Sequence, residues 1–242
     1  MLRNKKIEPP FFEIGPKAYM YGEEMVALAK KIDSAAKKYD VRVILTPQYT
    51  DIYRVARETE NILVFAQHMD SLPVGRGLGA VLPEAVKAAG AEGVMLNHTE
   101  KQLTLAELKA CIKRAEDIRL YTIVCADSIA EARMIALLNP DIIVCEPSEL
   151  IGTGMTSGAE YVMATNEAIK AINPDIQILQ AAGISNGEDV YDIIRCGAEA
   201  TGTTSGIMKA VDKEAMVDEM LGALRRAWNE KQAKGHAPSA RK

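Results

Sequence analysis

An acidic residue at the end of an apolar run is the feature of this chain that comes closest to indicating a reaction. Glu146 ends the run DIIVCE (141–146), and the loop after it finishes at Gly152-Thr153-Gly154. Such a run is typical of a strand buried on both faces, and glycines give a loop the freedom to close over a substrate. A carboxylate beneath a closing loop is a candidate general base.

Length, composition and charge limit the possible classes of protein. The 242 residues, of which 48% are hydrophobic, fit one α/β barrel or two small domains. A net charge of −4 gives no general attraction for nucleic acid or an anionic membrane, which favours a small-molecule partner. The N-terminal segment lacks a signal-like apolar core, and no run approaches the roughly 18 apolar residues of a membrane span, so we expect a cytoplasmic protein.

The cysteines indicate a reducing compartment. They are scattered without CxxC spacing and fall in or beside apolar runs, at Cys111, Cys125, Cys145 and Cys196. This pattern favours buried free thiols over disulfides or zinc ligands. We therefore expect no zinc site at the cysteines; elsewhere, too, we expect no metal site and no cofactor.

The positioning elements alternate regularly between strand and helix. Strand-like runs occur at 11–15, 41–46, 61–66, 93–97, 120–125, 141–146, 176–180 and, more weakly, 198–204. Amphipathic helical patterns occur near 22–38, 49–58, 82–89, 104–117, 128–138, 160–172, 187–196 and 212–230. Capping patterns at Thr104-x-x-Glu107 and Ser128-x-x-Glu131 support two of these helices.

Eight strand–helix units without a linker predict a single (β/α)8 barrel, an α/β fold. An open doubly wound sheet would usually carry a glycine-rich fingerprint after its first strand, whereas GPKAY follows here. The barrel domain is predicted to span 1–232. Apolar periodicity ends after Trp228, so we expect the last helix to fray there and 233–242 to form a flexible tail, in which His236 has no role.

In a barrel, chemistry belongs where the strands end at the carboxyl edge. This rule selects Lys17, His68, Asn97, His98, Thr99, Glu100, Glu146, Gly183, Ile184, Ser185, Thr204, Ser205 and Gly206. A cation, an imidazole and a carboxylate around one cavity suit proton transfer on an anionic carbonyl substrate without a metal. The glycine-containing loops 181–189 and 203–210 fit a phosphate site, so the substrate would be a phosphate ester.

Each of these residues also has a purely structural interpretation. A lysine after a strand is often solvated, an acid at a strand end can cap a helix, and loop glycines often only make turns. His98 could be an ordinary loop histidine, and we interpret His68 as structural. Their joint placement at one barrel mouth is what favours a site.

Four segments resemble the triosephosphate isomerase family, in its shorter archaeal-type branch. They are LNHTEK (96–101), EPSELIGTG (146–154), AAGISNGEDV (181–190) and VLPEAVKAAGAEG (81–93), within a similarity that runs from about 11 to 225. The resemblance implies Glu146 as the base that forms an enediolate, His98 as the electrophile and Lys17 as the electrostatic partner. In this family the histidine is known to act in its neutral form.

The resemblance also implies binding and supporting residues. Together with the strand-end positions, the candidate substrate and phosphate contacts are Gly15, Ile151, Gly152, Gly183, Ser185, Thr204, Ser205 and Gly206. Glu100 would support the lysine, and Asn97 is a second candidate supporting residue. A homo-oligomer, either a dimer or a tetramer, is implied as well.

Two positions depart from the family pattern. The family has Asn-x-Lys after its first strand, with the asparagine on the substrate, whereas this chain has Gly15-Pro16-Lys17. A threonine that reaches into the neighbouring subunit is replaced by Leu78. Losing a donor typically costs about 1 to 3 kcal/mol, or roughly a ten- to hundredfold slower triose turnover.

Three hypotheses follow from these observations. The first is interconversion of dihydroxyacetone phosphate and glyceraldehyde 3-phosphate. The second keeps the chemistry but admits a four-carbon sugar phosphate into space vacated at Gly15. The third is a barrel that binds a phosphorylated ligand without catalysis.

Overall fold

The computed structural model describes residues 7–147, 158–181 and 183–235. Within them, eight parallel strands close into one barrel in sequence order, β1 pairing with both β2 and β8. The strands are β1 (Phe11–Ile14), β2 (Arg42–Leu45), β3 (Ile62–Ala66), β4 (Gly93–Leu96), β5 (Tyr121–Ala126), β6 (Ile142–Cys145), β7 (Gln177–Gln180) and β8 (Ala200–Thr203). The predicted (β/α)8 barrel is confirmed.

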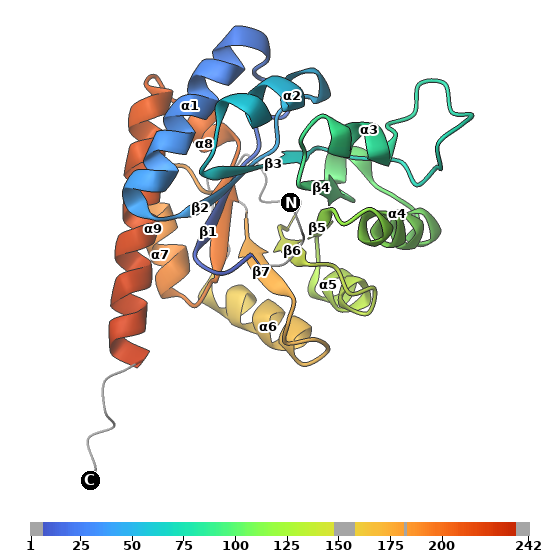
Figure 1. The fold of residues 1–242 in the computed structure, drawn as a ribbon. Coiled ribbons are helices and arrows are strands. Elements are labelled where there is room, and N and C mark those ends of the chain that lie inside the picture. The colour runs from blue at the N-terminus through green and yellow to red at the C-terminus, as the bar shows by residue number, and fades with distance from the viewer. Residues whose placement is uncertain (1–6, 148–157, 182, 236–242) are drawn as a thin grey trace.

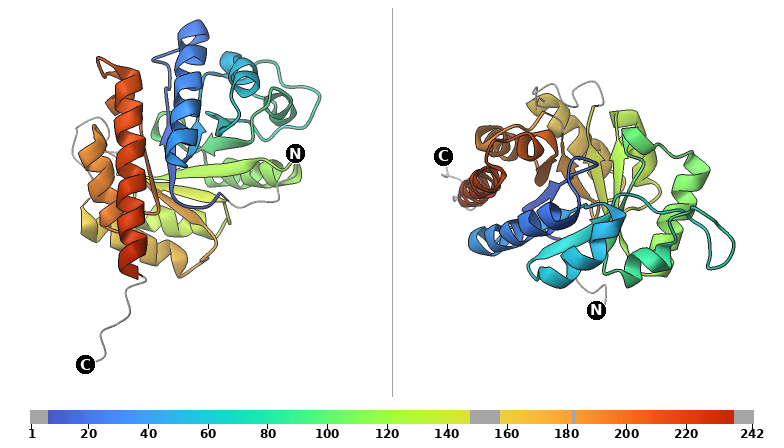
Figure 2. Two further views of the ribbon diagram at one scale, coloured as in Figure 1. Left: turned by 60° about the vertical axis from the view of Figure 1, so that its left-hand side comes forward. Right: turned by 90° about the horizontal axis from the view of Figure 1, so that it is seen from above.

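Helices surround the barrel (Figures 1 and 2). The main ones are α1 (Gly22–Tyr39), α2 (Tyr49–Glu58), α3 (Pro83–Ala88), α4 (Leu105–Asp117), α5 (Ile129–Ala136), α6 (Ala159–Lys170), α7 (Gly187–Arg195) and α9 (Lys213–Gly235). Two short helical segments were not predicted, the 3-10 turn η1 (Thr99–Lys101) and α8 (Ser205–Met208). No helix in the described ranges is long and apolar enough to cross a membrane.

The predicted caps of two helices are present. The Thr104 hydroxyl accepts from the backbone N–H of Glu107, whose carboxylate in turn accepts from the backbone N–H of Thr104. The Ser128 hydroxyl accepts from the backbone N–H of Glu131. These bonds satisfy backbone donors that a helix start leaves unpaired.

Alternating residues of each strand build two apolar layers. Inside the barrel lie side chains such as Phe11, Ile44, Phe65, Ile123 and Leu179. The residues between them face the helices, where Phe12, Val43 and Val64 join the larger core. Because neighbouring residues of a strand point in opposite directions, both faces must be apolar, which explains the uninterrupted apolar runs in the sequence.

The last helix differs from the prediction, because it continues past Trp228 to Gly235. Polar contacts, and not a stripe of apolar side chains, stabilise this end of the helix. The Lys231 ammonium donates to the carbonyl oxygens of Gly197 and Ala198 at 3.1 and 3.0 Å, and it lies 5.0 Å from the centre of the Trp228 ring. The predicted tail from 233 therefore begins within a helix, and residues 236–242, including His236, lie outside the described part of the chain.

A glycine at the start of β4 makes room for a large side chain inside the barrel. Gly93 pairs with Phe65 of β3, and a Cβ at Gly93 would lie 2.3 Å from a Phe65 ring carbon. Gly93→Ala should therefore lower the free energy of unfolding by about 1 to 3 kcal/mol, measured by urea denaturation. Gly158→Ala, whose added methyl would have no neighbour within 4 Å among the residues that the structure describes, should change it by less than about 1 kcal/mol. Equal losses in both variants would contradict this explanation.

Candidate active site

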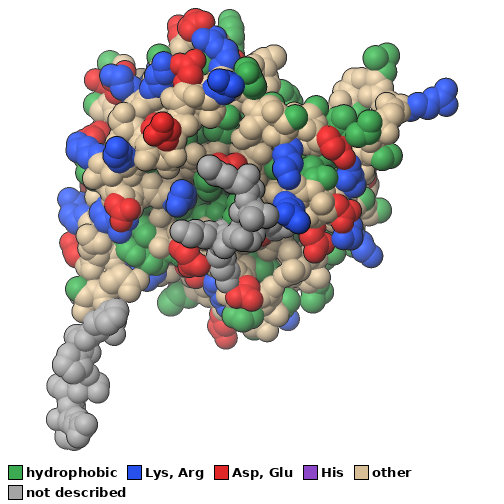
Figure 3. Space-filling model, viewed as in Figure 1, with side chains coloured by type: hydrophobic (Ala, Val, Ile, Leu, Met, Phe, Trp, Pro, Cys, Tyr) green, Lys and Arg blue, Asp and Glu red, His purple; other side chains and the backbone are tan. Residues whose placement is uncertain are grey.

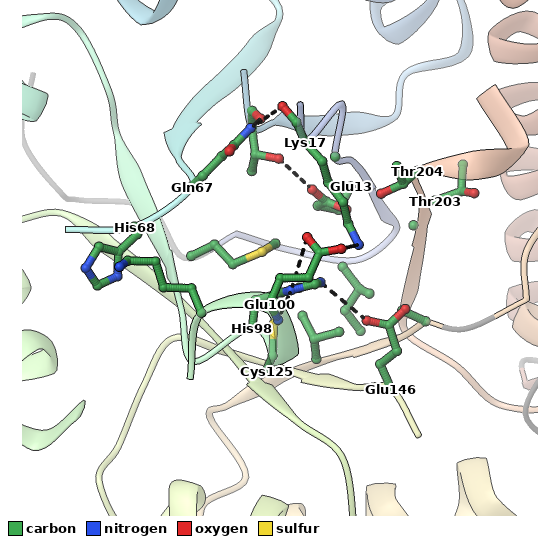
Figure 4. Close-up of a pocket in the computed structure, with 18 of the residues that line it drawn as sticks. Glu13, Lys17, Gln67, His68, His98, Glu100, Cys125, Glu146, Thr203 and Thr204 are labelled. Carbon is green, nitrogen blue, oxygen red and sulfur yellow. Dashed lines mark hydrogen bonds and ion pairs between the residues drawn. The ribbon is translucent and has the colours of Figure 1, made fainter. Parts of the chain in front are cut away.

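A cavity of about 460 Å³ opens at the carboxyl ends of the strands. Its lining includes residues that follow five different strands, namely Lys17, Gln67, His98, Glu146 and Thr204. The side chains of Lys17, His98 and Glu146 point toward one another there (Figure 4). The three candidate catalytic residues thus share one cavity, as the barrel geometry predicted.

Lys17 adopts a backbone conformation that neighbouring side chains hold in place. Its φ is 47°, in the left-handed region, and its carbonyl oxygen accepts from the side-chain amides of Gln48 and Gln67 at 2.6 and 3.0 Å. Its ammonium is 3.2 Å from Glu100 Oε1. This arrangement points the charge at the cavity. The sequence analysis missed both glutamines, although each follows a strand end.

His98 begins the η1 turn directly after β4. Its Nδ1 accepts from the backbone N–H of Glu100 at 3.1 Å, which leaves Nε2 to carry the proton of a neutral ring. Nε2 lies 4.0 Å from Glu146 Oε2. Burial lowers the pKa of His98, the Lys17 charge lowers it further, and Glu100 opposes them. A neutral imidazole with a donor directed into the cavity is the result.

Asn97, the residue before His98, stabilises the η1 turn through side-chain hydrogen bonds. Its φ is 60°, and its amide group donates to the carbonyl oxygen of Cys125 and to Glu131, each at 3.0 Å. Its side-chain oxygen accepts from the backbone N–H of Leu103. Asn97 therefore joins β4, β5 and the start of α4, and it fixes the backbone from which His98 projects.

Glu146 follows β6, where its backbone N–H donates to the carbonyl oxygen of Ala126 at 3.0 Å. The side chain is 19% exposed. Burial raises the pKa of its carboxyl, the Lys17 charge opposes that rise, and Glu100 adds to it. A carboxylate that is poorly solvated is a stronger base than one in water.

The candidate substrate and phosphate residues that the structure describes lie in two groups. Gly15, Gly183, Thr204 and Ser205 line the cavity, and Gly183 has a φ of 71° that favours glycine. Ser185 and Gly206 lie behind this lining. The Ser185 hydroxyl donates to the carbonyl oxygen of Gly183, and the Gly206 N–H donates to Thr203 Oγ1. Ile151 and Gly152 lie outside the described residues.

Two further predictions concern His68 and the cysteines. His68 is buried at the cavity wall, with Nε2 3.3 Å from Asp70 Oδ1. Its ring points away from the three catalytic candidates (Figure 4). That contact fits the structural interpretation of this histidine. The cysteine thiols are free; three are buried and Cys196 is half-buried.

The sequence analysis missed a buried carboxyl on β1. Glu13 is 8% exposed, lines the cavity and accepts from the Thr46 hydroxyl at 3.0 Å. The sequence did contain a signal, because Glu13 follows Phe11 by two residues and so shares its inward direction. A Cβ at Gly15 would lie only 3.0 Å from Glu13 Oε1 and 3.2 Å from Thr204 Oγ1. The expected free space beside Gly15 is therefore partly filled.

Comparisons with known proteins agree with this geometry. A sequence model of the triosephosphate isomerase family matches residues 13–219. The chain is 41% identical to the triosephosphate isomerase of Methanobacterium bryantii, over 89% of this chain and 97% of the relative. It is 37% identical to that of Saccharolobus solfataricus, over 91% and 99%. The crystal structure of the Bartonella henselae enzyme shares the fold, with a TM-score of 0.73 at 15% identity, covering 91% of this chain and 99% of that one.

Proposed function

The chain belongs to the triosephosphate isomerase family, and we propose that it interconverts dihydroxyacetone phosphate and D-glyceraldehyde 3-phosphate. The observation that carries this proposal is the convergence of Glu146, His98 and Lys17 on one cavity. A base, a neutral donor and a fixed positive charge are the groups that proton transfer beside a carbonyl requires.

The reaction needs no oxidant or reductant. The Glu146 carboxylate takes a proton from the substrate carbon beside the carbonyl. The electrons of the broken C–H bond form a C=C bond, and the carbonyl oxygen gains the negative charge of an enediolate. The His98 Nε2–H donates to this oxygen, and the Lys17 ammonium offsets the charge. A proton then passes through His98 from the neighbouring hydroxyl to this oxygen, so that the negative charge moves to the other oxygen. Return of the proton from Glu146 to the neighbouring carbon, with the C=C electrons forming the new C–H bond and the second oxygen becoming the carbonyl, completes the isomerisation.

The phosphate of the substrate would lie against the loops after β7 and β8. Gly183, Thr204 and Ser205 line that side of the cavity, across from the His98 turn. Backbone N–H groups and hydroxyls are suitable partners for a phosphate dianion. Ile151 and Gly152 would add contacts from the loop after β6, and Ser185 and Gly206 would brace the two loops.

Assembly of identical subunits is part of this proposal. The loop between β3 and α3 projects from the barrel (Figure 1), and the space-filling view shows apolar side chains on it (Figure 3). Val74 and Leu78 on it are fully or largely exposed. Exposed apolar residues on a projecting loop suit contact with a second copy, as either a dimer or a tetramer. We also propose that the protein works in the cytoplasm.

A steady-state assay tests the proposed function. The purified protein should turn over glyceraldehyde 3-phosphate with a kcat/KM at least about tenfold above that for four-carbon aldose and ketose phosphates, because the Glu13 carboxyl occupies space beside Gly15. Faster turnover of a four-carbon sugar would move the assignment to that substrate. Binding of all these phosphates without turnover would identify a non-catalytic barrel.

A further inference from the structure

A buried carboxyl in the floor of the cavity has no part in the proton transfer described above. Glu13 projects inward from β1, one layer above Phe11, and its side chain lines the cavity. The Thr46 hydroxyl at the end of β2 donates to its Oε1 at 3.0 Å. Its Oε2 makes no hydrogen bond within 7–147, 158–181 or 183–235, so one oxygen remains for a ligand.

Two glycines leave the room that this carboxyl fills. A Cβ at Gly202 of β8 would lie 2.9 Å from the Cβ of Glu13 and 3.1 Å from its Oε2. A Cβ at Gly15 would lie 3.0 Å from its Oε1. Contacts near 3.0 Å are too close for ordinary side chains. A glutamate at this point therefore depends on glycine at position 202, whereas a side chain at position 15 would require its carboxylate end to shift.

The surroundings of Glu13 favour its neutral form. Burial raises the pKa of the carboxyl to about 8, and the charge of Glu146 adds to the rise. The Thr46 hydrogen bond and the Lys17 charge lower it by less. Among the described residues, the Cys125 thiol on β5 also interacts electrostatically with Glu13, and burial raises the pKa of this thiol. On either side, β8 contributes Gly202, and Thr46 and Thr204 directly follow β2 and β8; none of these residues carries a charge.

We propose that Glu13 is a substrate-binding residue that acts as a neutral carboxylic acid, donating a hydrogen bond from Oε2 to an uncharged oxygen of the bound sugar phosphate. This inference rests on the proposed function for the identity of the ligand. Thr204 lies beside Gly15, lines the cavity and belongs to the loop assigned to the phosphate. Glu13, which also lies beside Gly15, is therefore next to the proposed phosphate site. An ionised Glu13 would lose its donor and would repel a phosphate dianion, so binding must weaken once this carboxyl ionises.

The test measures binding of glycerol 3-phosphate, which cannot isomerise, by calorimetry at pH 7 and pH 9.5. Its phosphate is already a dianion throughout this range, because the second pKa of a phosphate ester is about 6. The Kd of the wild type should rise by about tenfold from pH 7 to pH 9.5. The Kd of Glu13→Gln, whose amide is a neutral donor of the same shape, should change by less than about twofold. Glu13→Leu, which has no donor, should bind about tenfold more weakly at pH 7.

An equal pH dependence of Kd in the wild type and in Glu13→Gln would overturn the proposal. Thermal unfolding followed by circular dichroism checks each variant, and the comparison with Glu13→Gln decides the question even if Glu13→Leu does not fold. Turnover of the triose by the wild type is judged separately. An inactive wild type with the expected Kd pattern would refute the isomerase proposal and support Glu13 as a ligand contact. An active wild type whose Kd depends on pH in the same way as that of Glu13→Gln would support the isomerase proposal and refute the role of Glu13.

Discussion

Glu146→Gln should lower kcat/KM for glyceraldehyde 3-phosphate by about a hundred- to ten-thousandfold. The amide has the shape of the carboxylate but cannot take a proton, and a positioned general base typically contributes that factor. The side chain is largely buried, so water cannot readily replace it as the base. Transfer of deuterium from solvent to carbon 1 of dihydroxyacetone phosphate, followed by NMR, reports this single step and should slow by a similar factor.

The matched control is Glu24→Gln, which makes the same chemical change at an exposed position in the first turn of α1. It should retain wild-type kinetics. Glycerol 3-phosphate should bind Glu146→Gln within a few-fold of the wild type, because the cavity keeps its shape. If Glu146→Gln exchanged deuterium at the wild-type rate, another group would be the base, and the assignment of Glu146 would be wrong.

The fold could be predicted because its determinants are local in sequence. Strands covered on both faces must be apolar throughout, so runs such as 61–66 stand out from the amphipathic helices between them. The end of α9 could not be predicted in the same way. Lys231 holds that end through carbonyl oxygens of residues 197 and 198, and no periodic pattern in the helix itself records such a contact.

The residues of the candidate site also differ in how far they could be predicted from the sequence. Lys17, His98 and Glu146 follow strand ends, and in a closed barrel every strand end at the carboxyl edge faces the same cavity, so their meeting could be inferred from sequence position alone. The role of Glu13 could not be inferred, because the room for it depends on Gly202 of a strand that is distant in the sequence. In the sequence, the segment FFEIG (11–15) is an apolar run interrupted by one charged residue, Glu13. The spacing places Glu13 and Phe11 on the same face of the strand, but only the closed barrel shows that this face points inward, toward the cavity.

Lys17→Met should lower kcat/KM by about a hundred- to a thousandfold, since it removes the positive charge that faces the developing enediolate. The Lys17–Glu100 ion pair is partly exposed, with Glu100 at 63%, so the fold should lose little stability. The loss should therefore appear in the kinetics, while the midpoint of thermal unfolding stays close to that of the wild type. Lys109→Met, which removes the same charge from the exposed face of α4, should have wild-type activity.

The pH profile of Lys17→Met gives a second, independent measurement. The Lys17 charge lowers the pKa of Glu146, so its removal must raise that pKa. Because the base works only when ionised, activity is lost as pH falls through its pKa, and the acid limb of kcat/KM should move to higher pH in the variant. Lys17 also lowers the pKa of His98, so loss of its charge favours protonation of the imidazole and moves the limb in the same direction. An acid limb that stays in place or moves to lower pH would show that the lysine charge does not act on these two groups.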